Sequence, residues 1–166
     1  MTTLQTTLPD EHTFRSAFAS VPTSVAVVTG FGPNDEPVGL AVGSLVSVSL
    51  APPLLSFCAA QTSQSWPQIR LGGWFCVNVL ARDQEHVCRS FARSGQDKFL
   101  GLDWQRSAHG LPELAGAVAT MGCLVTDEIA AGDHTIVLGQ VVHMSARTGA
   151  DPLVFRGGRY GTFLGD

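Results

Sequence analysis

A stretch of small and hydroxyl-bearing residues between Gly39 and Trp66 has the residue types needed to hold a flat ligand with a polar tail. Ala41, Gly43 and Ser44 carry little side chain, so a planar ring could lie directly against the backbone there. Hydroxyl groups suited to a polar chain and a phosphate follow at Ser47, Ser49, Thr62, Ser63 and Ser65. A simpler interpretation, which the composition alone favours, is that these side chains satisfy turns and strand edges.

The histidine of Gly132-Asp133-His134 is the other candidate for chemistry, because it stands at the expected end of a hairpin. The residues alone leave two interpretations open. The imidazole extends over a cavity, or it bonds the backbone of its own turn. His143 follows nine residues later and alternates badly with His134 for a shared ion, so no metal site is expected.

Other chemistries lack their sequence patterns. The glycines of Gly30-Phe31-Gly32 run into Pro33 without the third glycine of a dinucleotide-binding loop. No nucleophile elbow or Ser/His/Asp order stands out. The four cysteines form no C-x-x-C pair and are interpreted as buried, reduced thiols: Cys58, Cys76, Cys88 and Cys123.

The elements that would position these residues are mostly strands, and their short connections favour an antiparallel barrel or sheet. Apolar and β-branched runs predict strands over 24–30, 37–41, 45–50, 54–60, 74–80, 117–129 and 135–146, and a small hairpin within 152–163. Helices are expected over 11–20, 64–71 and 83–93. The first helix should cap one end of a barrel. The second, capped by Ser63 or Ser65, would point its amides at an anion. Asp83 should cap the third, and 96–111 should be an irregular loop near the ligand.

The totals indicate one domain over residues 11–166, preceded by an arm over residues 1–10. Charged residues make up only 14% of the chain, against about 25% in typical domains. We therefore expect a second copy to cover apolar surface, including an outer strand over 74–80. A net charge of -4 argues against nucleic acid. No signal peptide or membrane-spanning run is visible, so a cytoplasmic protein without membrane contact is expected.

Taken in order, three features resemble the flavin reductase family of FMN-binding split barrels. They are the stretch 39–66, the Pro52-Pro53 pair within it, and Gly132-Asp133-His134-Thr135-Ile136. The resemblance implies a mainly β protein with a few helices, folded as an antiparallel split β-barrel. It implies an NAD(P)H-dependent enzyme that reduces FMN or FAD and releases reduced flavin to a partner monooxygenase. A homodimer is also implied, with flavin near the subunit interface. Two alternatives stay open: a non-catalytic flavin-binding protein of the same fold, and an oxidase resembling those that act on pyridoxamine phosphate.

The resemblance also assigns roles to individual residues. Ala41-Val42-Gly43-Ser44 would hold the isoalloxazine edge, Ser47 and Ser49 would follow the polar tail, and Ala59-Ala60-Gln61 with Ser65-Trp66 would contact the ribityl chain and phosphate. Phe91-Ala92-Arg93 would form a second wall, Lys98 would pair with the phosphate, His134 would face the nicotinamide, and Tyr160 would lie near the same pocket. The family commonly has Thr and Asn where this chain has Ala41 and Gly43. Two side-chain hydrogen bonds to the ring, each worth about 1 kcal/mol, would therefore be missing.

Overall fold

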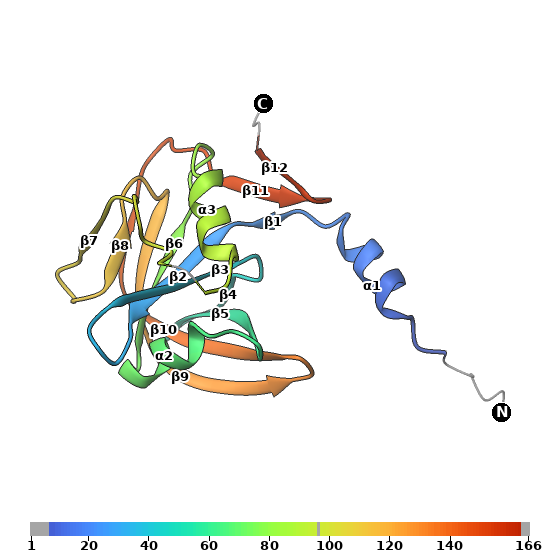
Figure 1. The fold of residues 1–166 in the computed structure, drawn as a ribbon, viewed down its shortest axis with the longest axis horizontal. Coiled ribbons are helices and arrows are strands. Elements are labelled where there is room, and N and C mark those ends of the chain that lie inside the picture. Colours follow the sequence, from blue (N-terminus) through green and yellow to red (C-terminus); the bar gives the residue numbers. More distant parts are fainter. Residues whose placement is uncertain (1–6, 96, 164–166) are drawn as a thin grey trace.

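The computed structural model describes residues 7–95 and 97–163, and a curled antiparallel sheet is its main element. Seven strands form this sheet in the order β3-β2-β6-β9-β10-β5-β4 (Figure 1). In chain order they are β2 (Ala26–Phe31), β3 (Pro37–Val42), β4 (Val46–Leu50), β5 (Pro53–Ala60), β6 (Trp74–Val79), β9 (Ala119–Ala131) and β10 (His134–Ala146).

The two edge regions of the sheet come together without forming a ladder. β3 approaches β5 there, and Cys58 N donates a hydrogen bond of 2.8 Å to Ser44 Oγ across the junction. The sheet therefore curls into a barrel with a split between β3 and β5. This arrangement confirms the predicted antiparallel split barrel with mainly β structure.

The barrel interior holds the first of two apolar clusters. Phe57, Trp66 and Phe75 are buried there and contact one another edge to face, with ring centroids 5.2 to 5.9 Å apart. Aromatic pairs of this kind add about 0.5–1.5 kcal/mol to the burial of their area. β2 is buried on both faces, as its nearly unbroken apolar sequence predicts, because its outer face carries the second cluster.

Helix α3 (Glu85–Ala92) covers the second cluster with one apolar face formed by Val87, Cys88 and Phe91. It is shorter than the expected helix over 83–93, and its N-cap is Gln84 instead of Asp83. The Gln84 amide explains the difference, since it is buried and bonds the backbone at Ala81 N and Ala115 O. The side chain of Gln84 therefore fixes the start of the helix to the neighbouring loops.

A buried polar network attaches the small sheet of β7 (Trp104–Arg106) and β8 (Pro112–Leu114) to the barrel. Asn78 accepts a 2.8 Å hydrogen bond from Leu114 N and donates one of 3.0 Å to Thr29 Oγ1. Thr29 in turn donates to Pro112 O at 2.6 Å. The predicted irregular loop over 96–111 is thus partly a hairpin, and Gln96 lies outside the described residues.

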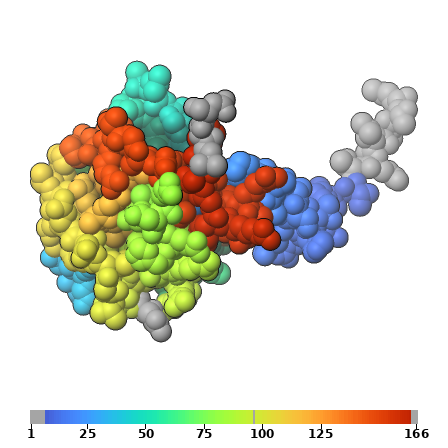
Figure 2. All heavy atoms as spheres, turned by 90° about the horizontal axis from the view of Figure 1, so that it is seen from above, coloured from blue at the N-terminus to red at the C-terminus, as the bar shows by residue number. Residues whose placement is uncertain are grey.

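Helix α1 (Glu11–Phe18) projects from the body beside the C-terminal hairpin (Figure 2). None of its residues is buried, so the prediction that it caps the barrel is wrong for this chain. A three-stranded sheet lies at its base, formed by β1 (Thr23–Ser24), β11 (Leu153–Arg156) and β12 (Arg159–Thr162). Gly157 N donates to Ala19 O at 2.8 Å, and Arg156 Nε donates to Ser20 O at 3.1 Å. These two bonds fix the point from which the helix leaves.

Two further expectations are corrected. The strand over 74–80 is β6, which lies in the middle of the sheet between β2 and β9, so it is no uncovered outer strand. The helix expected over 64–71 is one turn, α2 (Trp66–Ile69), continued by the 3₁₀ turn η1 (Arg70–Gly72). Gly73, with a φ of 69°, ends it just after the predicted end at residue 71. Within the described residues, none of the helices is long and apolar enough to cross a membrane.

Candidate functional site

A cleft of about 1580 Å³ opens at the split of the barrel. One wall is β3, and the other is the end of β5 with the segment that continues to α2. The two walls run in opposite directions: Ser44 meets Cys58 at one end, and Lys98 bridges Gly39 and Ser65 at the other. The C-terminal end of α3 and the following loop close the side of the cleft.

Small residues on β3 determine the shape of the first wall. Val38, Leu40 and Val42 pack into the barrel, so the alternate residues Gly39 and Ala41 turn toward α3. A Cβ atom on Gly39 would lie 2.8 Å from Cδ1 of Phe91 and closer still to Cε1. Glycine is therefore required at this position for α3 to sit against the strand.

The free edge of β3 supplies backbone hydrogen-bonding groups to the cleft. β3 pairs with β2 on its other side only. Gly39 O accepts from Lys98 Nζ, a side chain that lines the cleft. In an extended strand, alternate residues turn these groups to the same side, so the backbone groups of Ala41 also face the opening. Gly43 follows directly after the strand and lines the same cleft. These amides and carbonyls can bond the polar edge of a flat heterocycle.

The opposite end of the cleft is cationic and rich in hydroxyls. Lys98 Nζ donates to Gly39 O at 3.1 Å, to Phe91 O at 3.2 Å and to Ser65 Oγ at 3.3 Å. Burial lowers the pKa of Lys98 below its usual value. Ser63 and Thr62 line the same region. An ammonium with neighbouring hydroxyls is suited to a phosphate group, which would replace one of the three acceptors that the ammonium now contacts.

The predicted contribution of a helix N-terminus to this phosphate site is not supported. α2 is four residues long, and its first amide, Trp66 N, already donates to Ser63 Oγ at 3.2 Å. Ser65, the residue before the helix, makes no cap bond and accepts from Lys98 instead. The anion would therefore be held by side chains more than by a dipole.

His134 lines the cleft as the first residue of β10, opposite Ala60 of β5. Its side chain is 44% exposed, and its Nδ1 lies 2.7 Å from Oδ1 of Asp133. That contact holds the pKa of the Asp133 carboxyl below its usual value. Gln61 fixes the turn from the other side, since its side-chain Nε2 donates to Gly132 O and its backbone N donates to Asp133 O. The imidazole is thus oriented by a carboxylate at the mouth of the cleft.

The structure brings most of the predicted site residues together. Those that line the cleft are Ala41, Val42, Gly43, Ser44, Ala60, Ser65, Phe91, Ala92, Arg93, Lys98 and His134. Those that do not are Ser47, Ser49, Ala59, Gln61, Trp66 and Tyr160.

The exceptions have physical reasons. Ala59 and Trp66 are buried in the barrel core, where the Trp66 indole donates to Glu128 Oε1 at 2.7 Å. Ser47 and Ser49 lie on β4, which pairs with the far end of β5 from the cleft. Tyr160 packs behind α3, with its hydroxyl 3.3 Å from Cys88 Sγ.

Sequence reasoning missed several residues of the cleft. Phe155, on the strand paired with that of Tyr160, is the C-terminal aromatic that lines it. Gly39 belongs to the first wall, and Thr23 of β1 lines the cleft next to it. The alternation of small residues in Gly39-Leu40-Ala41-Val42-Gly43 is the signal that could have identified Gly39. No comparable signal marks Phe155, because its position depends on the pairing of β11 with β1.

The cysteines are only partly the core thiols that the sequence predicts. Cys76, Cys88 and Cys123 are buried, and burial raises the pKa of Cys76 and of Cys123 to about 12. Cys58 is different, since it is partly exposed and lines the cleft beside Ser44. Among the described residues, no group of three or more His, Cys, Asp or Glu side chains could hold a metal ion.

The cleft fits a flavin nucleotide. A slot of small residues with a free backbone edge suits the isoalloxazine ring, and the Lys98 end suits the phosphate. Its volume also exceeds the 300–1,000 Å³ or so of common ligand pockets, which leaves room for a second ring system.

Known proteins are similar to this chain in both sequence and fold. A flavin reductase like domain matches residues 18–164. A flavin reductase of Pseudomonas putida is 42% identical, with 93% of this chain and 91% of that protein covered. The reductase subunit HsaB of a flavin-dependent monooxygenase from Rhodococcus jostii is 38% identical, covering 91% of this chain and 77% of that protein.

A solved structure is similar over nearly the whole chain. The NADH:FAD oxidoreductase SgcE6 of Streptomyces globisporus, in complex with NAD and FAD fragments, superposes with a TM-score of 0.86 at 36% identity, covering 97% of this chain and 99% of that one. With the family model matching from the end of α1 almost to the C-terminus, the chain belongs to the flavin reductase like family.

Proposed function

We propose that this chain is a flavin reductase that uses NADH to reduce FMN or FAD and supplies the reduced flavin to a separate monooxygenase. The cleft carries this proposal, because a slot for a flat ring, a phosphate-binding end and an oriented histidine lie in one opening. The relatives support each part: a flavin reductase, a monooxygenase reductase subunit and an NADH:FAD oxidoreductase.

In this proposal the chain binds and aligns, while the two cofactors supply the hydride chemistry. The backbone edge at Ala41 and Gly43 holds the ring, and its amides would stabilise negative charge on it. Lys98 and Ser65 hold the phosphate. His134, oriented by Asp133, positions the nicotinamide over the ring. Alignment of the two rings is the main way in which a protein can accelerate such a hydride transfer.

The test is NADH oxidation by the purified chain with FMN or FAD added. Steady turnover that scales with added flavin supports the proposal. A chain that binds flavin and remains idle would instead be a non-catalytic flavin-binding protein, and oxidation of pyridoxamine phosphate would indicate the related oxidase activity. Parallel titrations with NADPH, and of FMN against FAD, give the preference for each substrate.

We also propose that the chain forms a homodimer through the outer face of β5, β9 and β10. Side chains paired across these strands alternate between the barrel core and this face. Ile136 and Leu138 on this face are half-buried, and Ile129 is exposed. The same face ends at Ala60 and His134, so a second copy there would border the cleft.

An aspartate at Ile129 should weaken a dimer built on this face. Leu71→Asp is the matched control, because Leu71 is also exposed but lies in η1, outside the face. Sedimentation would measure both. A wild-type chain that is a stable monomer at micromolar concentration, or equal effects of the two substitutions, would contradict the proposal.

A further inference from the structure

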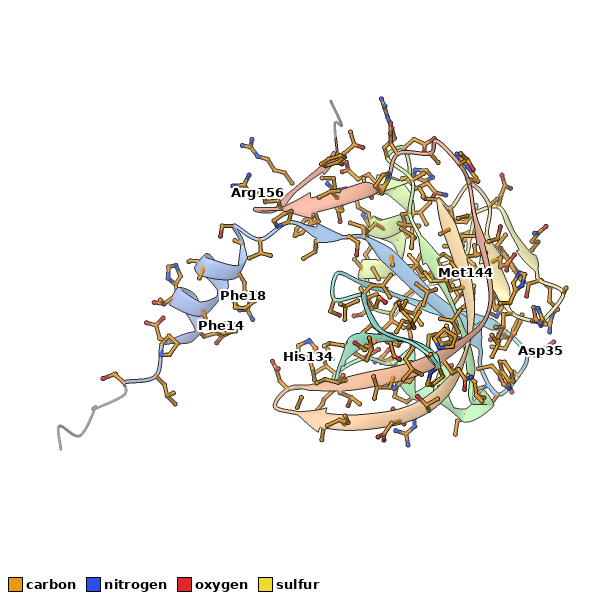
Figure 3. The ribbon with its side chains drawn as sticks, turned by 180° about the vertical axis from the view of Figure 1, so that it is seen from behind. Phe14, Phe18, Asp35, His134, Met144 and Arg156 are labelled. Atoms are coloured by element: carbon orange, nitrogen blue, oxygen red, sulfur yellow. The ribbon has the colours of Figure 1, made fainter. Side chains whose placement is uncertain are left out.

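The cleft has an aromatic end that the proposed roles do not use. Phe18, the last residue of α1, lines the cleft although its side chain is 60% exposed. Phe14, one turn earlier, stacks on it with ring centroids 4.6 Å apart and an angle of 27° between the rings. Figure 3 shows both phenyl groups on the side of α1 that faces the β9–β10 hairpin and His134. An exposed, doubled aromatic surface thus forms one border of the cleft mouth.

The helix that carries these rings is stabilised at its N-terminal end. Asp10 Oδ1 accepts from Thr13 N at 2.7 Å, and Glu11 pairs with Arg15 at 2.7 Å. An eight-residue helix is nevertheless marginal in water without tertiary packing of an apolar face. The two hydrogen bonds from the β11–β12 hairpin hold the base of α1 at the cleft. A ligand that covered Phe18 would supply the missing packing.

The aromatic end and the phosphate-binding end lie at opposite ends of β3. Lys98 contacts Gly39, whereas Gly43 lies against Thr23, whose strand partner is the cleft residue Phe155. Four residues of extended strand between Gly39 and Gly43 span roughly 13 Å. A flavin whose phosphate contacts Lys98 would therefore extend any adenosine group away from Phe18. The aromatic end stays available to the other dinucleotide.

We propose that Phe18, supported by Phe14, is a stacking platform for the adenine ring of the dinucleotide hydride donor. The proposal rests on the proposed function, since it names how the donor is held in the same cleft. His134 pairs with Ala60, which lies on the wall between Cys58, at the Ser44 end, and Ser65, at the Lys98 end. A donor with its nicotinamide at His134 can therefore extend its adenine away from Lys98 and toward Phe18. Flat purines stack on aromatic side chains, and removing such a contact weakens binding by a factor of roughly 5 to 100.

The experiment compares Phe18→Ala with Phe18→Trp, Phe14→Ala and the matched control Phe163→Ala. Phe163 is 69% exposed and lies outside the cleft lining. For each variant, KM is measured for NADH and for reduced nicotinamide mononucleotide, which lacks adenine. Equilibrium titrations give the Kd of ADP-ribose, which carries the adenine without the nicotinamide, and of FMN and FAD. Sedimentation reports the oligomeric state.

We expect Phe18→Ala to raise the KM for NADH and the Kd of ADP-ribose about 5- to 20-fold, since the ring is only partly covered. The KM for reduced nicotinamide mononucleotide and the Kd of FMN should not change. Phe14→Ala should have a smaller effect in the same direction, and Phe18→Trp and Phe163→Ala should match the wild type.

Three other results would overturn the proposal. Equal changes for NADH and reduced nicotinamide mononucleotide would place Phe18 at the nicotinamide. A loss for FAD without one for FMN or ADP-ribose would assign the platform to the flavin's adenine. A shift to monomer with unchanged ADP-ribose binding would assign the helix face to a second copy. Failure of the proposed function differs from all three, since the wild-type chain would then not oxidise NADH at all.

Discussion

Substituting alanine for Gly39 should displace the helix that walls the cleft. The new Cβ would lie 2.8 Å from Cδ1 of Phe91 and closer to Cε1, and the Phe91 ring is 2% exposed, with little free space to move into. Overpacking of this kind costs about 1–3 kcal/mol. For a chain of this length each kcal/mol lowers Tm by about 2–4 °C, so we expect a fall of roughly 2–12 °C.

The same substitution should weaken flavin binding, because Lys98 bonds both Gly39 O and Phe91 O. Moving α3 away from β3 would break one of these bonds and shift the ammonium. A hydrogen bond to a charged group is worth about 1.5–3 kcal/mol, so the Kd of FMN should rise about tenfold or more. Calorimetry gives Tm, and quenching of flavin fluorescence gives Kd.

Gly72→Ala is the matched control, since a Cβ there meets nothing within 4 Å and the backbone does not require glycine. Phe91→Leu in the Gly39→Ala background should recover part of both losses, because the shorter side chain lacks the colliding Cε1 atom. An unchanged Tm and Kd in Gly39→Ala, or equal effects of the two glycine substitutions, would refute the inference that α3 packs against β3 only because residue 39 has no side chain.

The other predictions concern three single side chains: Lys98, His134 and Asn78. Lys98→Met should raise the Kd of FMN about 10- to 100-fold and leave that of riboflavin, which has no phosphate, unchanged in the same fluorescence titration. Burial lowers the pKa of Lys98 below the ordinary lysine value of 10.5. In the wild type, the affinity for FMN should therefore be highest below that lowered pKa and should fall as the pH rises through it. Lys98→Arg should remove this fall. His134→Ala should raise the KM for NADH with little change in the Kd of FMN, and steady-state kinetics with the opposite pattern would return His134 to a turn role. Asn78→Leu should lower the unfolding free energy in urea by about 1–3 kcal/mol, because it leaves the buried Leu114 amide without its partner, while unchanged stability would show that the network is dispensable.

The pattern of strands could be predicted from the sequence because each strand has a local signature. The long strands around Gly132-Asp133 alternate in apolar character, and β2 is apolar throughout because it is covered on both sides. Their order in the sheet could not be predicted. The aromatic strand β6 looks exposed in the sequence, yet it pairs with β2 and β9, which lie far away along the chain.

The candidate site was predictable to the same extent. The residues around Gly43 and those around Ser65 belong to one stretch of sequence. They line one cleft because β3 forms one wall, and the end of β5 with the segment leading to α2 forms the other. Contributions from distant elements were not predictable. Phe155 lines the cleft and Tyr160 does not, although the two are strand partners with ring centroids 5.1 Å apart. The difference comes from the strand order β1-β11-β12, which places Phe155 next to Thr23 and Tyr160 on the outer strand.

The absence of a larger side chain at Gly43 has a structural explanation in the packing of β1, whereas nothing in the structure explains the alanine at position 41. A Cβ on Gly43 would lie 3.1 Å from Thr23 Oγ1, so a side chain there would require the threonine to shift by a few tenths of an ångström. Thr23 itself lines the cleft, and its hydroxyl occupies the space next to the strand. In the proposed site, binding of the ring would then depend on the backbone edge of β3 instead of on two side chains of that strand. Such a site holds its ligand less tightly, by about 1 kcal/mol for each neutral bond lost, which favours a flavin that must leave after reduction.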